Sequence, residues 1–161
     1  MRSIPAVLSL VLVANCGGGT TSTTPKQHTV HRRGDCLPER EDGSYHLDAA
    51  QAGARRGASD RRFGDTVTTQ RAPIQACGLH GVLTWLTRVT CAGGSKPWGE
   101  DFNQAHAGRK GSAMENLLSC DKPVDLYIAP CPERAYEIFL DMYHCGPHEE
   151  LWRSVDLGAP T

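Results

Sequence analysis

The sequence lacks the patterns that identify most enzymes and membrane-spanning proteins. It has no run of about 20 apolar residues, the length that a helix needs to cross a bilayer. It also lacks a GxSxG nucleophile motif, a phosphate-binding loop and a dinucleotide-binding fingerprint. Its 17 lysines and arginines nearly balance 18 aspartates and glutamates, so the chain has no overall basic character. We therefore expect no nucleic-acid partner and no cofactor.

The amino-terminal segment has the character of an export signal. Arg2 supplies a positive charge, and 4–14 is a mostly apolar stretch. This stretch is too short to span a membrane but fits the hydrophobic region of a secretory signal. Cys16 and a run of glycines follow it directly.

Four residues at the end of this segment, Val13-Ala14-Asn15-Cys16, resemble the lipobox of bacterial lipoproteins, although glycine, alanine or serine is usual in place of Asn15. The resemblance covers about the first 20 residues. It implies cleavage before Cys16, which then carries a diacylglyceryl group and further acylation, such as palmitate, as the new first residue. Gly17, in place of the aspartate typical of inner-membrane retention, implies the outer membrane. The alternative is an ordinary signal cut near Ala14, which would leave a secreted or periplasmic protein.

The cysteine count agrees with an exported protein. Seven cysteines are present, and an odd number in an exported chain normally indicates a free thiol. If Cys16 carries lipid, six remain, enough for three disulfides in an oxidising compartment. These disulfide candidates are Cys36, Cys77, Cys91, Cys120, Cys131 and Cys145.

Composition divides the chain into four parts. All three tryptophans and three of the four tyrosines lie after residue 66, which places the core there. Small polar residues dominate after Cys16, and they cannot bury enough apolar surface to offset the entropy of ordering. We expect a signal peptide over 1–15, the lipidated Cys16 with a flexible linker over 16–35, a polar, mildly basic and partly ordered tail over 36–65, and a small disulfide-stapled domain over 66–161.

The 36–65 tail offers two features. Alanine-rich 48–56 favours a short helix. The pairs Arg55-Arg56 and Arg61-Arg62 would suit anionic lipids or cell-wall polymers, but a solvated connector is the stronger interpretation. The membrane, reached through the lipid anchor, and an envelope protein or polymer are the expected partners.

The 66–161 domain is expected to be α+β or mainly β. Residues 82–91 and 124–129 are rich in β-branched and apolar side chains and predict strands. Residues 135–145 fit either a strand or a helix. The strand is favoured because its aromatic residues suit an antiparallel hairpin with 124–129, with Tyr136, Ile138, Leu140 and Met142 on the inner face.

Two further expectations depend on these strands. Cys91 and Cys145 each close a predicted strand, which favours pairing between them, whereas an extended strand would keep Cys77 away from Cys91. The apolar residues near the carboxyl end are expected to cap the core; they are Leu151, Trp152, Val155 and Leu157.

Weak catalytic candidates occur in two places. Asp101 and His106 lie in a polar, glycine-bearing stretch, and a histidine with a carboxylate can transfer protons. Cys77 and His80 have the composition of a thiol nucleophile and its base, although a disulfide is the stronger interpretation of Cys77.

The HCGPH segment is the weak metal candidate. His144 and His148 flank Cys145, and histidine and cysteine at short spacing bind zinc. No CxxC pair accompanies them, and an oxidised Cys145 cannot be a ligand. In an exported protein, oxidation of Cys145 is therefore the stronger interpretation.

Together these features favour a lipid-anchored protein of the cell envelope that serves as a non-catalytic binding or structural module. The alternative is an envelope hydrolase or metal-dependent enzyme that uses His106, Asp101 and His144. A third possibility is an inhibitor or protective lipoprotein that acts on a secreted partner.

Overall fold

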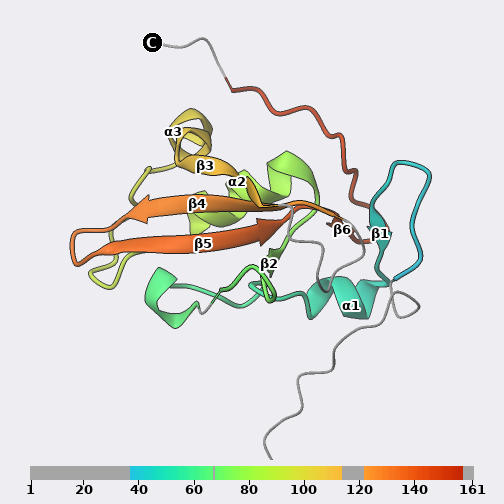
Figure 1. Cartoon of the computed structure of the whole chain (residues 1–161), viewed down its shortest axis with the longest axis horizontal. Helices are drawn as coiled ribbons and strands as arrows, with labels where there is room; N and C mark the ends of the chain where they lie inside the picture. The colour runs from blue at the N-terminus through green and yellow to red at the C-terminus, as the bar shows by residue number, and fades with distance from the viewer. Residues whose placement is uncertain (1–36, 67, 114–121, 158–161) are drawn as a thin grey trace, which may run out of the picture.

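The computed structural model describes residues 37–66, 68–113 and 122–157, which form an α+β fold (Figure 1). The predicted fold class is therefore confirmed. The signal peptide, Cys16, Cys36 and Cys120 lie outside the described residues. The elements are β1 (Tyr45–His46), α1 (Ala49–Gly53), the 3₁₀ helix η1 (Phe63–Asp65), β2 (Ile74–Gln75), α2 (Gly78–Arg88), α3 (Phe102–Ala107), β3 (Arg109–Ala113), β4 (Val124–Pro130), β5 (Ala135–Asp141) and β6 (His144–Cys145).

The main sheet has four strands in the order β2-β5-β4-β3. β5 is antiparallel to β4 and parallel to β2, and β3 is antiparallel to β4. β1 and β6 form a separate parallel pair. Figure 1 shows α2 behind the sheet, so helix and sheet make two layers.

The predicted hairpin between 124–129 and 135–145 is confirmed as β4 and β5. Leu126 faces Phe139, and Tyr127 faces Ile138 across the pair. The expected inner face of β5 is also found, because Tyr136, Ile138 and Leu140 are all buried. This face contacts α2 in the core.

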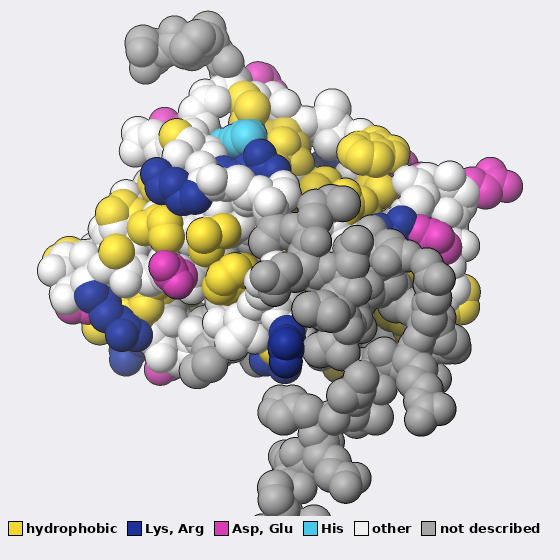
Figure 2. Space-filling model, in the orientation of Figure 1, with side chains coloured by type: hydrophobic (Ala, Val, Ile, Leu, Met, Phe, Trp, Pro, Cys, Tyr) yellow, Lys and Arg dark blue, Asp and Glu magenta, His cyan; other side chains and the backbone are white. Residues whose placement is uncertain are grey.

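The outer face of the same hairpin is more apolar than a solvated sheet surface usually is. Leu126, Ile128 and Phe139 alternate with the buried residues and are half-buried. Figure 2 shows hydrophobic side chains over β4 and β5 in the part of this face that is not grey.

Among the described residues, no helix combines the length and the apolar character that crossing a membrane requires.

The strand predicted for 82–91 is wrong, because most of it belongs to α2. Val82, Leu83 and Leu86 are buried at helical spacing and pack on the sheet. Thr87 fits the helix because its hydroxyl donates to the Leu83 carbonyl at 2.9 Å. Packing against the sheet therefore overrides the strand preference of the β-branched residues.

The short helix predicted for 48–56 is confirmed as α1. Asp48 caps it by accepting a hydrogen bond from the Gln51 backbone N–H at 2.8 Å. The Gln51 side chain accepts in return from the Asp48 N–H, which completes a capping box.

The centre of the core is an aromatic cluster around Phe63. Its ring is fully buried and lies 5.8 Å from Trp85, 6.0 Å from Trp98 and 6.1 Å from Tyr136. Phe63 precedes the expected domain boundary at residue 66, and so does the buried Tyr45. The 36–65 segment thus contributes directly to the core.

Disulfide bonds, as predicted, are present. Cys77 bonds to Cys145 and Cys91 bonds to Cys131, so the expected Cys91–Cys145 pair is wrong. That expectation required 82–91 to be a strand. The helix is instead about 16 Å long. Cys91 follows its carboxyl end and bonds there to Cys131 of the β4–β5 turn. The start of α2 is consequently tied to β6, and the segment after its end is tied to the β4–β5 turn of the main sheet.

The prediction that apolar residues near the carboxyl end cap the core is confirmed in part. Leu151 is buried, and Val155 and Leu157 pack against the core. Trp152 does not cap the core, because it is 69% exposed. Its indole N–H donates to the Asp42 carbonyl at 3.2 Å, and its ring lies over the surface.

Candidate functional site

A cleft of about 670 Å³ lies where three segments meet. One wall is 52–58, which comprises the end of α1 and the turn after it. The second is 75–88, which comprises the end of β2 and most of α2, and the third is 148–153. The volume is in the range of small-molecule sites, so this cleft is the main candidate for a binding site in the described part of the chain.

An ion pair joins the first wall to the third. Arg55 donates from Nη1 to Glu149 Oε2 at 2.6 Å and from Nη2 to Oε1 at 2.9 Å. Arg40 donates to the Glu149 carbonyl at 3.0 Å and to the Gly146 carbonyl at 2.7 Å. Such two-point arginine contacts fix geometry as well as charge, so the two walls are held at a set separation.

Glu149 is also held in its charged form. Burial opposes ionisation, but hydrogen bonds from Arg55 and the Gly146 N–H outweigh it and keep the pKa of Glu149 below its ordinary value. The contribution of this carboxylate to stability is therefore present above the unfolded-state pKa and is lost as pH falls through the folded-state pKa.

Glu149→Gln is expected to remove part of the acid sensitivity of the fold. The wild type should lose about 1 kcal/mol of unfolding free energy as pH falls below 4.5, a small amount because the pair is partly exposed. The variant should not show this loss. Urea unfolding across the acid range measures it, with Glu137→Gln, an exposed glutamate, as the matched control. Equal pH dependence in both variants would contradict the assignment.

The α2 wall is fastened to the turn at Gly57. The Trp85 indole N–H donates to the Gly57 carbonyl at 3.1 Å, and Arg88 donates to the carbonyls of Gly57 and Ala58 at 2.8 and 2.9 Å. Gly57 has a φ of 91°, and a Cβ there would lie 3.0 Å from the Trp85 nitrogen. Only glycine suits this close approach.

A buried polar group lies behind Gln75 in the cleft wall. The Gln75 Oε1 accepts from the Arg56 N–H at 3.2 Å, so its Nε2 is the atom that faces His144 Nε2 at 3.0 Å. His144 Nδ1 lies 3.4 Å from Asp141 Oδ2, which is within ion-pair distance, but no hydrogen bond joins the two atoms. Both His144 and Asp141 are buried.

This arrangement assigns the His144 tautomer. Because Gln75 donates to Nε2, the proton of the neutral ring is on Nδ1, toward Asp141. A carboxylate beside Nδ1 is the geometry of a catalytic histidine. Here, however, the nitrogen that would act as the base is occupied by Gln75, so the group joins β2, β5 and β6.

The catalytic candidates Asp101 and His106 are not brought to His144. Asp101 caps α3 by accepting from the backbone N–H groups of Asn103 and Gln104 at 2.8 and 3.2 Å. His106 is in the last turn of α3. Figure 1 places α3 beside β3 and well to the left of β6, which carries His144. The structure thus separates His144 from the other two residues, one of which caps α3 while the other lies within it. Cys77 is bonded to Cys145, so it is no thiol partner for His80.

The metal candidates are separated in the same way. His144 is buried against Gln75, whereas His148 is exposed at the rim of the cleft. Cys145, between them in sequence, is in a disulfide. The structure therefore does not combine His144, Cys145 and His148 into a ligand set.

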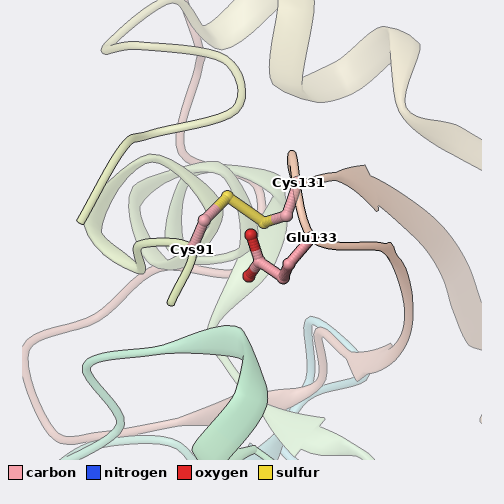
Figure 3. Close-up of side chains that lie close together, drawn as sticks. All are labelled: Cys91, Cys131 and Glu133. Atoms are coloured by element: carbon pink, nitrogen blue, oxygen red, sulfur yellow. A yellow bond between two sulfur atoms is a disulfide. The ribbon is translucent and has the colours of Figure 1, made fainter. Parts of the chain in front are cut away.

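Another group has the spacing of metal ligands. Donor atoms of Cys91, Cys131 and Glu133 all lie within 4.8 Å of one another, and Figure 3 shows the Glu133 carboxylate beside the disulfide. The two sulfurs are bonded to each other, so neither is a thiolate. Glu133 Oε1 accepts from the Ala92 N–H at 2.8 Å and the Tyr136 hydroxyl at 3.0 Å. In the oxidised protein this group fastens the turn after α2.

Sequence reasoning missed most of the cleft. It considered Arg55 only as part of a basic pair, and it did not consider Gln75, Arg88 or Arg153. These residues are far apart in the sequence and share no motif. The available signal was the unusual density of arginine around 55–62.

No family model, curated protein or solved structure matches this chain.

Proposed function

We propose that the protein is a lipid-anchored binding module of the bacterial cell envelope. The observation that carries the binding role is the cleft, whose walls are held by the Arg55–Glu149 pair and by the bonds of Trp85 and Arg88 to the 57–58 turn. A site fixed before its ligand arrives loses less entropy on binding. The anchor rests on the sequence around Cys16.

The disulfides support the proposed location. Cys77–Cys145 lies at the cleft, since Cys77 is one of its lining residues. Disulfides persist in oxidising compartments and are rare in the cytosol. An exported domain that carries its ligand site beside a disulfide is consistent with a role in the envelope.

Intact-mass analysis of the protein extracted from membranes tests the anchor. We expect a chain that begins at Cys16 and carries fatty acids, and a mass that rises on reduction by two hydrogens for each disulfide. Cys16→Ser should abolish the lipid mass and release the protein from the membrane fraction, because a diacyl anchor is what gives stable attachment.

A matched substitution one residue away, Asn15→Ser, should retain lipidation, because serine is usual at that lipobox position. A mature protein that lacks fatty acid and has only free thiols would contradict both the anchor and the location.

A further inference from the structure

The charges that line the cleft do not cancel. Arg55 and Glu149 neutralise each other through two hydrogen bonds. The remaining formal charges are those of Arg88, Arg153 and Glu150, which leave one net positive charge in the cleft. The whole chain, by contrast, has a net charge of −1. The cleft is therefore a local positive region on a slightly acidic protein.

Donor groups in the cleft remain available for a ligand. A guanidinium has five N–H donors, and the hydrogen bonds of Arg88 to the Gly57 and Ala58 carbonyls use two nitrogens without exhausting them. Arg153 is exposed and lines the cleft. His80 and His148 also line the cleft, and each neutral imidazole has one N–H donor.

From this charge and these donors we infer that the cleft binds a phosphate-bearing ligand, with Arg88 and Arg153 as its charged contacts and His80 and His148 as further donors. This inference rests on the proposed binding function and names its ligand class. Phosphate presents several strong acceptor oxygens, which donors on separate walls can contact together. The cleft is larger than one phosphate group needs, so the group is expected to be part of a larger molecule.

Two sources supply this chemistry in an envelope: the headgroup of an anionic lipid, and a soluble phosphate ester or polymer. The binding site uses the same contacts for either. For a protein anchored by its amino terminus, the lipid surface is nearby, whereas a soluble ligand would reach the cleft by diffusion.

Backbone and indole NMR titration of the Cys16→Ser variant, which lacks the lipid anchor and keeps its disulfides intact, tests the inference. Inorganic phosphate is the first probe, followed by phosphatidylglycerol vesicles with phosphatidylcholine vesicles as their neutral control. We expect saturable shifts at Gly81, Thr84 and the Trp85 indole N–H, which line the cleft. Arg153→Gln should weaken phosphate binding about fivefold to tenfold, the effect of losing one ordinary hydrogen bond at an exposed position.

Arg71→Gln is the matched control, because Arg71 is exposed on the Thr69–Ala72 turn and does not line the cleft. It removes the same charge and should change the affinity less than twofold. Equal weakening by both substitutions would overturn the site in favour of general electrostatic attraction. Binding of phosphate together with phosphatidylglycerol vesicles identifies the lipid source, and binding of phosphate alone identifies the soluble one.

The failure of this inference can be distinguished from the failure of the proposed function. A neutral disaccharide serves as the third probe. Cleft shifts with the disaccharide but not with phosphate would overturn the phosphate assignment and leave a binding module. No cleft shifts with any probe would overturn the phosphate assignment and remove the support for the binding role, while membrane anchoring is judged by the mass analysis.

Discussion

Phe63→Ala is expected to lower the free energy of unfolding by about 3–5 kcal/mol, the usual cost of deleting a fully buried aromatic ring. The ring has no exposed surface and contacts Trp85, Trp98 and Tyr136 at centroid distances near 6 Å. These partners come from α2, the 92–101 loop and β5, so no single element can close the cavity. Chemical denaturation of the oxidised protein measures the loss.

The same substitution at Phe139 is the matched control. Phe139 lies on the outer face of β5 and is only half-buried. Its replacement by alanine should cost about half as much or less, because less apolar surface is withdrawn from water there. Equal losses at the two positions would show that Phe63 is not the centre of the core.

Removing the Cys77–Cys145 disulfide by replacing both cysteines with alanine is expected to cost about 4 kcal/mol, on the chain-entropy estimate for a loop of 68 residues. The bond fastens the start of α2 to β6 beside the cleft. Both cysteines are buried, and replacing both avoids a new free thiol. Denaturation of the variant and the wild type without reductant measures the difference.

The Cys91–Cys131 pair gives an internal comparison. It closes a loop of 40 residues and should contribute slightly less by the same estimate. Full reduction of the wild type should destabilise it at least as much as the Cys77→Ala, Cys145→Ala double substitution does. A variant as stable as the oxidised wild type would contradict a stabilising role for this bond.

The hairpin and the helix were not equally predictable. In β4 and β5 the local preference for strand agrees with the alternation of buried and exposed residues, so sequence reasoning found them. In α2 the two disagree. Val82, Thr84, Thr87 and Val89 favour a strand locally, but the helix buries Val82, Leu83 and Leu86 against the sheet. Packing these residues against the sheet stabilises the helix by more than the intrinsic strand preference of the β-branched residues opposes it. The sequence of this segment alone does not reveal the sheet that makes this contact.

The incorrect strand prediction for 82–91 also led to the incorrect pairing of Cys91 with Cys145. A strand ending at Cys91 would have placed it beside the end of the next strand, whereas the helix directs it to the β4–β5 turn.

The cleft could not be predicted from the sequence for a related reason. Arg55, Arg88 and Arg153 are brought together only by the packing of α1, α2 and the carboxyl-terminal segment. Their spacing in the chain has no period or motif from which this could be read.

The link from Cys77 to Cys145 also determines how the protein responds to mechanical force. If the proposed anchor holds the amino-terminal end, tension between it and a point near residue 150 would pass through the sulfur–sulfur bond. The residues between the two cysteines would bear no load, so roughly 230 Å of chain would not be extended. The hairpin and α2 lie within this loop and would not be pulled apart, whereas Phe63 lies outside it and would be drawn away from the core as the outer segments extend.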